Sequence, residues 1–109
     1  MAITPEKIKE LKFPPLTEHD YSAGSKHTSL PGFSESSNMY YNCVTIFTDS
    51  KRDNYGGPRW TQYTVKVCGD KYGETADEVV LPRGATLKDA KQKAYEMAAE
   101  YAKQGLLYA

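Results

Sequence analysis

Basic side chains form two groups in this chain, and their types and spacing offer its clearest chemistry. One group precedes a predicted strand, where cations are interleaved with Tyr55 and end at Trp60. The other surrounds the start of the predicted last helix. Because cations neutralise phosphates and aromatic rings stack on bases, both groups are typical of nucleic-acid contacts. The predicted binding residues are Arg59, Trp60, Arg83, Lys88 and Lys91, with Lys51, Arg52 and Lys66 as secondary positions.

The lysines at the start of the last helix are not explained by helix energetics. A cation in the first turn faces the positive end of the helix dipole and weakens the helix slightly. At about 100° per residue, Lys88 and Lys91 lie about 60° apart on one flank of the apolar stripe, whereas Lys93 lies on the other. The free amides of a helix N-terminus attract phosphate, and nearby cations add to that attraction. A solvated, lysine-rich face is the alternative that the sequence leaves open.

The patterns that indicate a metal site or a catalytic centre are not found in the sequence. Its histidines and cysteines are His19, His27, Cys43 and Cys68, and their spacing matches no metal-binding module. There is no Gly-x-Ser-x-Gly elbow, and the glycines at 56 and 57 are not followed by a helix, as a phosphate-binding loop requires. We therefore expect no enzyme, no metal and no cofactor, and we expect both cysteines to be reduced thiols.

Charge and hydropathy limit the classes of protein further. The 109 residues contain 14 basic and 14 acidic side chains, so the formal net charge is zero. That balance argues against a strongly basic nucleic-acid binder and equally against an acidic DNA mimic, so only local asymmetry of charge supports a partner. No apolar run is long enough to span a membrane, and the first residues lack a signal-peptide pattern, which predicts a cytoplasmic protein.

The elements that must position the basic residues belong to one predicted α+β domain covering 1–109. Residues 1–12 predict a short helix with Thr4 as its cap and Pro5 at its first position. Residues 13–38 predict a long irregular arm, whose spaced apolar residues favour packing across the sheet over a free linker. Residues 39–81 predict a three-stranded antiparallel sheet, and residues 86–105 predict one long helix.

Local patterns define the sheet and the last helix. The strands are predicted at 39–48, 60–68 and 77–81, and the second alternates, with Tyr63, Val65 and Val67 on a covered face and the intervening polar residues on a wet one. The acidic pair at 77 and 78 indicates solvated charge at a strand edge. Thr86 and Asp89 predict a capping box, and Gly105 predicts the C-terminal cap.

From Gly57 to Ala102 the chain resembles a double-stranded RNA-binding domain. Residues 57–60 are similar to the Gly-Pro turn of that family's first hairpin, which touches the minor groove. Residues 63–67 are similar to its second strand. Residues 87–91 are similar to the lysine-rich entry of its last helix, although Leu87 stands where the family has the first of three lysines. The resemblance implies contact between Lys88, Lys91 and RNA phosphates.

Two further interpretations remain open. Three strands followed by a helix also resemble the DNA-binding domains of phage integrases and plant ethylene-response factors, which insert a sheet face into the major groove. The other is a small accessory or inhibitor protein, of the kind that phages encode, that binds a host protein complex through its Tyr-rich sheet and arm. A homodimer through the free sheet edge is also plausible. The leading prediction is a small non-catalytic module that binds nucleic acid through the first hairpin and the entry of the last helix.

Overall fold

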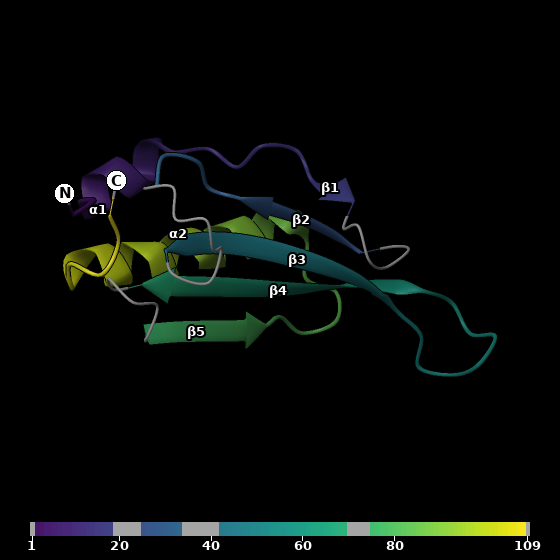
Figure 1. Cartoon of the computed structure of the whole chain (residues 1–109). Coiled ribbons are helices and arrows are strands. Elements are labelled where there is room, and N and C mark those ends of the chain that lie inside the picture. Colours follow the sequence, from purple (N-terminus) through teal and green to yellow (C-terminus); the bar gives the residue numbers. More distant parts are fainter. Residues whose placement is uncertain (1, 19–24, 34–41, 70–74, 109) are drawn as a thin grey trace.

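The computed structural model describes residues 2–18, 25–33, 42–69 and 75–108, and it is an α+β domain, as predicted (Figure 1). Its strands form one antiparallel sheet in the order β1-β2-β3-β4-β5, with both helices on one face. The elements are α1 (Pro5–Glu10), β1 (Thr17–Glu18), β2 (Lys26–Ser29), β3 (Cys43–Lys51), β4 (Trp60–Gly69), β5 (Thr75–Val80) and α2 (Leu87–Lys103).

The prediction of three strands is wrong, because the segment predicted as an irregular arm supplies β1 and β2. These strands have 2 and 4 residues, too short for an apolar alternation to be visible in the sequence. They are held by contacts distant in sequence: the Thr28 hydroxyl donates to the Pro14 carbonyl at 2.7 Å, and the Leu30 amide donates to the Val44 carbonyl at 3.0 Å. The expectation that apolar residues of this segment pack across the sheet is confirmed by Leu30, which is buried.

The register of β3 and β4 divides the sheet into two faces. Val44 lies opposite Val67 and Ile46 opposite Val65, and all four are fully buried beneath α2. Paired residues share a face, so the predicted covered face of β4 is confirmed. The opposite face mixes polar residues with Phe47, Trp60 and the two cysteines, and it is not uniformly wet as predicted, since Thr45 is buried there. Its hydroxyl lies 2.8 Å from that of Ser29 on the next strand.

The predicted capping box starts α2. The Thr86 hydroxyl accepts from the Asp89 amide at 3.2 Å, and the Asp89 carboxylate accepts from the Thr86 amide at 2.9 Å. An alanine stripe on α2, formed by Ala90, Ala94 and Ala98, is fully buried and lets the helix lie close to the sheet. The last helical turn is bounded by Gln104, and Gly105 follows with a positive φ of 73°, which a glycine adopts without strain.

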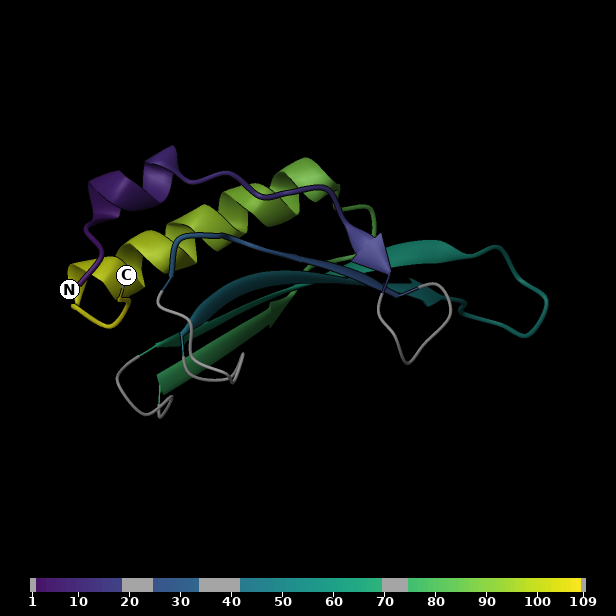
Figure 2. The same ribbon diagram turned by 45° about the horizontal axis from the view of Figure 1, so that its top comes forward.

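The short helix α1 is stable because it docks on α2. Ile8 is completely buried, and the Tyr95 hydroxyl of α2 donates to the Leu11 carbonyl at 2.5 Å. The two ends of the chain are joined by a hydrogen bond of 2.7 Å from the Ile3 amide to the Leu107 carbonyl. The termini therefore lie together at one end of the domain, and the β3–β4 hairpin extends past the start of α2 at the other end (Figure 2).

Among the residues that the structure describes, no helix is long and apolar enough to cross a lipid bilayer.

Candidate nucleic-acid interface

The sheet separates the predicted binding residues of the hairpin onto opposite faces. Trp60 lies opposite Lys51 in the register. Its side chain alternates in direction with the β4 residues that face α2, so its ring lies on the face of the sheet without helices, the open face. Arg59 is its neighbour in sequence and is directed the other way. The Arg59 guanidinium donates to the Ser50 hydroxyl at 3.1 Å, and Ser50 belongs to the helix face. These two predicted residues therefore do not form one contact surface.

On the open face, Asp53 holds Trp60 and Arg83 together. The Trp60 indole nitrogen donates to Asp53 Oδ1 at 3.3 Å, and the guanidinium of Arg83 forms an ion pair with Asp53 Oδ2. The guanidinium carbon also lies 5.2 Å from the centroid of the Trp60 ring, a cation–π contact. The structure thus brings two predicted residues together across 23 positions of sequence, but an acidic side chain neutralises the cation.

A second acidic side chain neutralises Lys51. The Lys51 ammonium lies 3.1 Å from Asp49 Oδ2. The hydrogen bond from Lys51 is the main cause that lowers the pKa of Asp49. Arg52 is exposed in the hairpin turn. Lys66 lies at the middle of β4, opposite Thr45 on one side and Glu78 on the other, away from the hairpin turn. The open face consequently offers no continuous cationic surface from the predicted residues.

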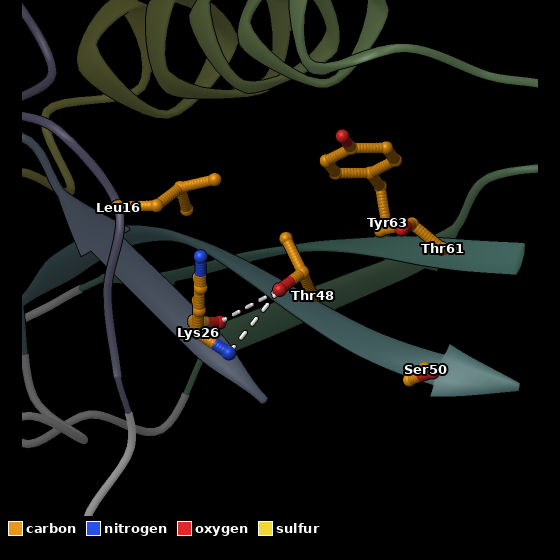
Figure 3. A pocket seen from close by; sticks show the side chains of 6 residues that line it. All are labelled: Leu16, Lys26, Thr48, Ser50, Thr61 and Tyr63. Carbon is orange, nitrogen blue, oxygen red and sulfur yellow. Dashed lines mark hydrogen bonds between the residues drawn. The ribbon is translucent and has the colours of Figure 1, made fainter. Parts of the chain in front are cut away.

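On the helix face, a pocket of about 340 Å³ lies over the base of the hairpin. Figure 3 shows the Lys26 ammonium and the Tyr63 hydroxyl rising from the sheet toward the helix side. Hydroxyl groups dominate the rest of the lining, and the Arg59 guanidinium reaches its rim through Ser50. The lining residues are Leu16, Lys26, Thr48, Ser50, Thr61 and Tyr63. A site with one ammonium, a guanidinium at its rim and several hydroxyls suits an oxyanion such as a phosphate.

Lys26 is not among the binding residues predicted from the sequence. Its strand is only 4 residues long and lies inside the segment predicted as an arm, so no periodic pattern marks the residue. The position of Lys26 follows from pairing: it lies opposite Thr48, which lies opposite Tyr63. The Lys26 amide also donates to the Thr48 hydroxyl at 3.1 Å, which ties the start of β2 to the pocket.

Lys88 and Lys91 lie on the first two turns of α2, which begins above this end of the sheet (Figure 2). Lys88 is exposed and Lys91 is half-buried. Neither forms an ion pair with the residues that the structure describes, and the same holds for Lys26 and Arg59. These cations belong to the same side of the molecule as the pocket.

The capping box bears on the expectation that free amides of the first turn attract phosphate. The Asp89 amide of that turn already donates to the Thr86 hydroxyl, and the Asp89 carboxylate accepts from the Thr86 amide. That hydrogen bond lowers the pKa of Asp89, so the cap is anionic at neutral pH. Lys88 and Lys91 therefore act as point charges beside a helix start whose cap carries a negative charge of its own.

The described residues among those considered for metal binding lie on the opposite face of the sheet from the pocket. His27 is on β2 opposite Phe47, with ring centroids 6.5 Å apart, and His19 lies outside the described residues. Cys43 and Cys68 are free thiols opposite each other on the open face, and burial together with the nearby Cys43 raises the pKa of Cys68 to about 11. No group of three or more histidine, cysteine or acidic side chains is gathered among the described residues.

Comparison with family models, with curated proteins and with solved structures finds no match for this chain.

Proposed function

We propose that this protein is a non-catalytic module that binds the backbone of a nucleic acid through the helix face of its projecting hairpin. The observation that carries the proposal is the cationic rim, which we define as Lys26, Arg59, Lys88 and Lys91. Lys26 lines the hydroxyl-lined pocket, the Arg59 guanidinium reaches it through Ser50, and Lys88 and Lys91 lie on α2 on the same side of the sheet. None of the four forms an ion pair with the described residues. Cations without acidic partners remain available to phosphates, whereas Arg83 and Lys51 are already neutralised.

The proposed contacts divide by chemistry. Lys88 and Lys91 neutralise phosphates as point charges, and Lys26 with Arg59 directs one phosphate or sugar toward the pocket. The hydroxyls of Ser50, Thr61 and Tyr63 supply hydrogen-bond partners for backbone oxygens. All of these contacts position a backbone without reading bases, so the binding is weakly dependent on sequence. In this proposal Trp60 and Arg83 brace the hairpin from its open face and do not stack on a base.

The resemblance to double-stranded RNA-binding domains favours duplex RNA over other nucleic acids. In that family the first hairpin and the start of the last helix lie on one side of the molecule and span adjacent grooves. The hairpin and the start of α2 lie at the same end of this domain, which is compatible with that geometry (Figure 2). Duplex RNA, duplex DNA and single strands are therefore the three probes that the experiment compares.

The test is a titration of each labelled nucleic acid at two salt concentrations, followed by electrophoresis. We expect affinity for duplex RNA to fall steeply with salt, with a slope of about −3 to −4 if each rim cation meets one phosphate. The charge-reversed variant Lys88→Glu/Lys91→Glu loses about a hundredfold in affinity, and Lys26→Glu loses about tenfold.

The matched control is Lys9→Glu/Lys103→Glu, which makes the same change of charge at exposed positions outside the rim. It keeps most of the affinity. Absence of binding at low salt, or an equal loss in the control, would refute the proposal.

A second candidate function is protein binding through the hairpin turn. Its supporting observation is Tyr55, which is fully exposed at this turn, two positions along the chain from Asp53 of the Trp60–Arg83–Asp53 cluster. Tyrosine, tryptophan and arginine are the residues that dominate protein interfaces. A partner recovered from nuclease-treated lysate by the wild type, and lost with Tyr55→Ala, favours this candidate. Tyr55→Phe is the matched control, because it keeps the ring and removes only the hydroxyl.

A further inference from the structure

The strand β5 lies at the end of the sheet order, and no described strand pairs with its outer edge. The Leu81 amide donates to the Tyr63 carbonyl at 2.9 Å, which fixes the direction of the backbone groups along this strand. Along an antiparallel strand, the backbone amide and carbonyl of alternate residues either bond the neighbouring strand or point away from it. The backbone groups of Val79 and Asp77 therefore bond β4. The amides and carbonyls of Ala76, Glu78 and Val80 therefore point outward, away from β4.

Beside this edge, a groove of about 260 Å³ separates β5 from α2. Its apolar lining comes from Val79 and Met97, and carboxylates of Asp77 and Glu100 lie in the same groove. The Tyr101 hydroxyl donates to Asp77 Oδ2 at 2.6 Å and fixes this carboxylate. The groove thus combines an apolar part near Val79 with an acidic part near Asp77.

We propose that an extended, basic segment of another protein binds here as a sixth strand, antiparallel to β5. Its backbone bonds the outward amides and carbonyls of β5, and its alternate side chains enter the groove, as in strand addition generally. The residue opposite Val79 is apolar and packs against Met97. Two positions later, the residue opposite Asp77 is lysine or arginine and pairs with Asp77 and Glu100. This site is independent of the cationic rim.

The charges at the edge favour this occupant over a second copy of the chain. If two β5 strands pair antiparallel in the most complete registers, Asp77 faces Asp77 or Glu78 faces Glu78. Like charges directly opposite each other destabilise strand pairing. A basic partner gains from the same carboxylates. Two carboxylates and the single ammonium of Lys93 line the groove, so the groove carries net negative charge. Val80, 52% exposed at the outer edge, offers further apolar contact.

The first test measures fluorescence anisotropy of the full chain with a labelled peptide of sequence GTVTKTG. The control peptide GTVTETG reverses the one charge that the groove is proposed to recognise. We expect saturable binding of the first peptide at concentrations where the second does not bind. Equal binding of both peptides, or binding of neither at millimolar concentration, would overturn the proposal.

The second test removes one outward backbone donor. Ala76→Pro deletes an amide hydrogen that does not bond β4, a place where an edge strand tolerates proline. We expect about three- to tenfold weaker binding of GTVTKTG, which corresponds to one net main-chain hydrogen bond. The matched control Ala76→Thr keeps the amide and binds as the wild type does.

A third measurement uses the wild-type protein, so it does not require that a variant folds. In wild-type protein, addition of GTVTKTG shifts the backbone amide resonances of residues 76, 78 and 80 more than those of 77 and 79. Shifts confined to the hairpin would overturn the proposal. A dimer detected by light scattering that Ala76→Pro disperses would assign the edge to a second copy and would also overturn it.

Discussion

The two flanks of α2 carry opposite chemistry. One flank, with Lys88 and Lys91, lies on the side of the hydroxyl-lined pocket and presents cations without acidic partners among the described residues. The other flank faces β5 and presents Glu100 beside Asp77, with Lys93 as the single cation in the groove, so its net charge is negative. The formal net charge of zero therefore conceals two unlike surfaces. A neutral chain is compatible with an anionic partner and a cationic partner at the same time, because attraction depends on the local field.

The two surfaces also differ in what supports them. The acidic groove depends on close backbone packing, since β4 approaches the end of α2 at Gly69. A Cβ atom added there would lie 2.8 Å from Tyr101 Cδ2 and 3.0 Å from the Leu106 carbonyl oxygen. The pocket rests instead on the hairpin register and on polar contacts such as that between Lys26 and Thr48. Substitutions can therefore damage one surface and spare the other.

The largest effect is expected for Gly69→Ala. Overpacking against Tyr101 and the Leu106 backbone should lower the free energy of unfolding by about 2 kcal/mol. Because Tyr101 holds Asp77, peptide binding at β5 should weaken as well, whereas affinity for nucleic acid should change little. Urea unfolding and the two binding titrations measure these effects. Unchanged stability would contradict the overpacking at Gly69. An equal loss of binding at both surfaces would show that the two surfaces are not independently supported.

The fold was predictable where a pattern extends over many residues. The alternation in β4 identified Val65 and Val67 as core, and the spacing of Thr86 and Asp89 identified the start of α2. The strands β1 and β2 were missed because their pairing depends on contacts such as that between Thr28 and Pro14, which leave no periodic trace.

The candidate site was predictable only as a list of basic residues. The sequence does not show which cation forms an ion pair, because Asp53 and Arg83 pair across 30 positions of the chain. It also placed Arg59 and Trp60 together, although neighbours in a strand lie on opposite faces. Lys26 joins the rim through pairing of β2 with β3, which sequence alone did not reveal.

A smaller effect is expected at the start of α2, where Asp89 caps the helix that carries Lys88 and Lys91. Its pKa is below the usual 3.8, mainly because it accepts from the Thr86 amide. A lowered pKa means that the ionised carboxylate favours the folded state, so its contribution is complete above pH 3.8 and is lost as pH falls through the folded value. Asp89→Asn should therefore be less stable than wild type at pH 7, and the difference should shrink below pH 3.8.

Thermal unfolding of both proteins from about pH 2.5 to about pH 7, a range that spans the titration, measures this difference. Glu96→Gln, an exposed change of the same kind farther along α2, is the matched control. A constant difference between Asp89→Asn and wild type across this range would contradict the assignment of the cap to the ionised carboxylate.

The smallest effect is expected for Asp53→Asn. This variant removes the acidic partner of Arg83, so it compares a paired cation with the cations of the cationic rim. The ion pair with Arg83 is about half exposed, with side-chain accessibilities of 51% and 55%, so its loss should cost less than about 1 kcal/mol. The variant frees a positive charge on the open face. If nucleic acid binds the helix face, the slope of affinity against salt should stay the same. A slope steeper by about one unit would place Arg83 in contact with a phosphate and would extend the interface across both faces of the hairpin.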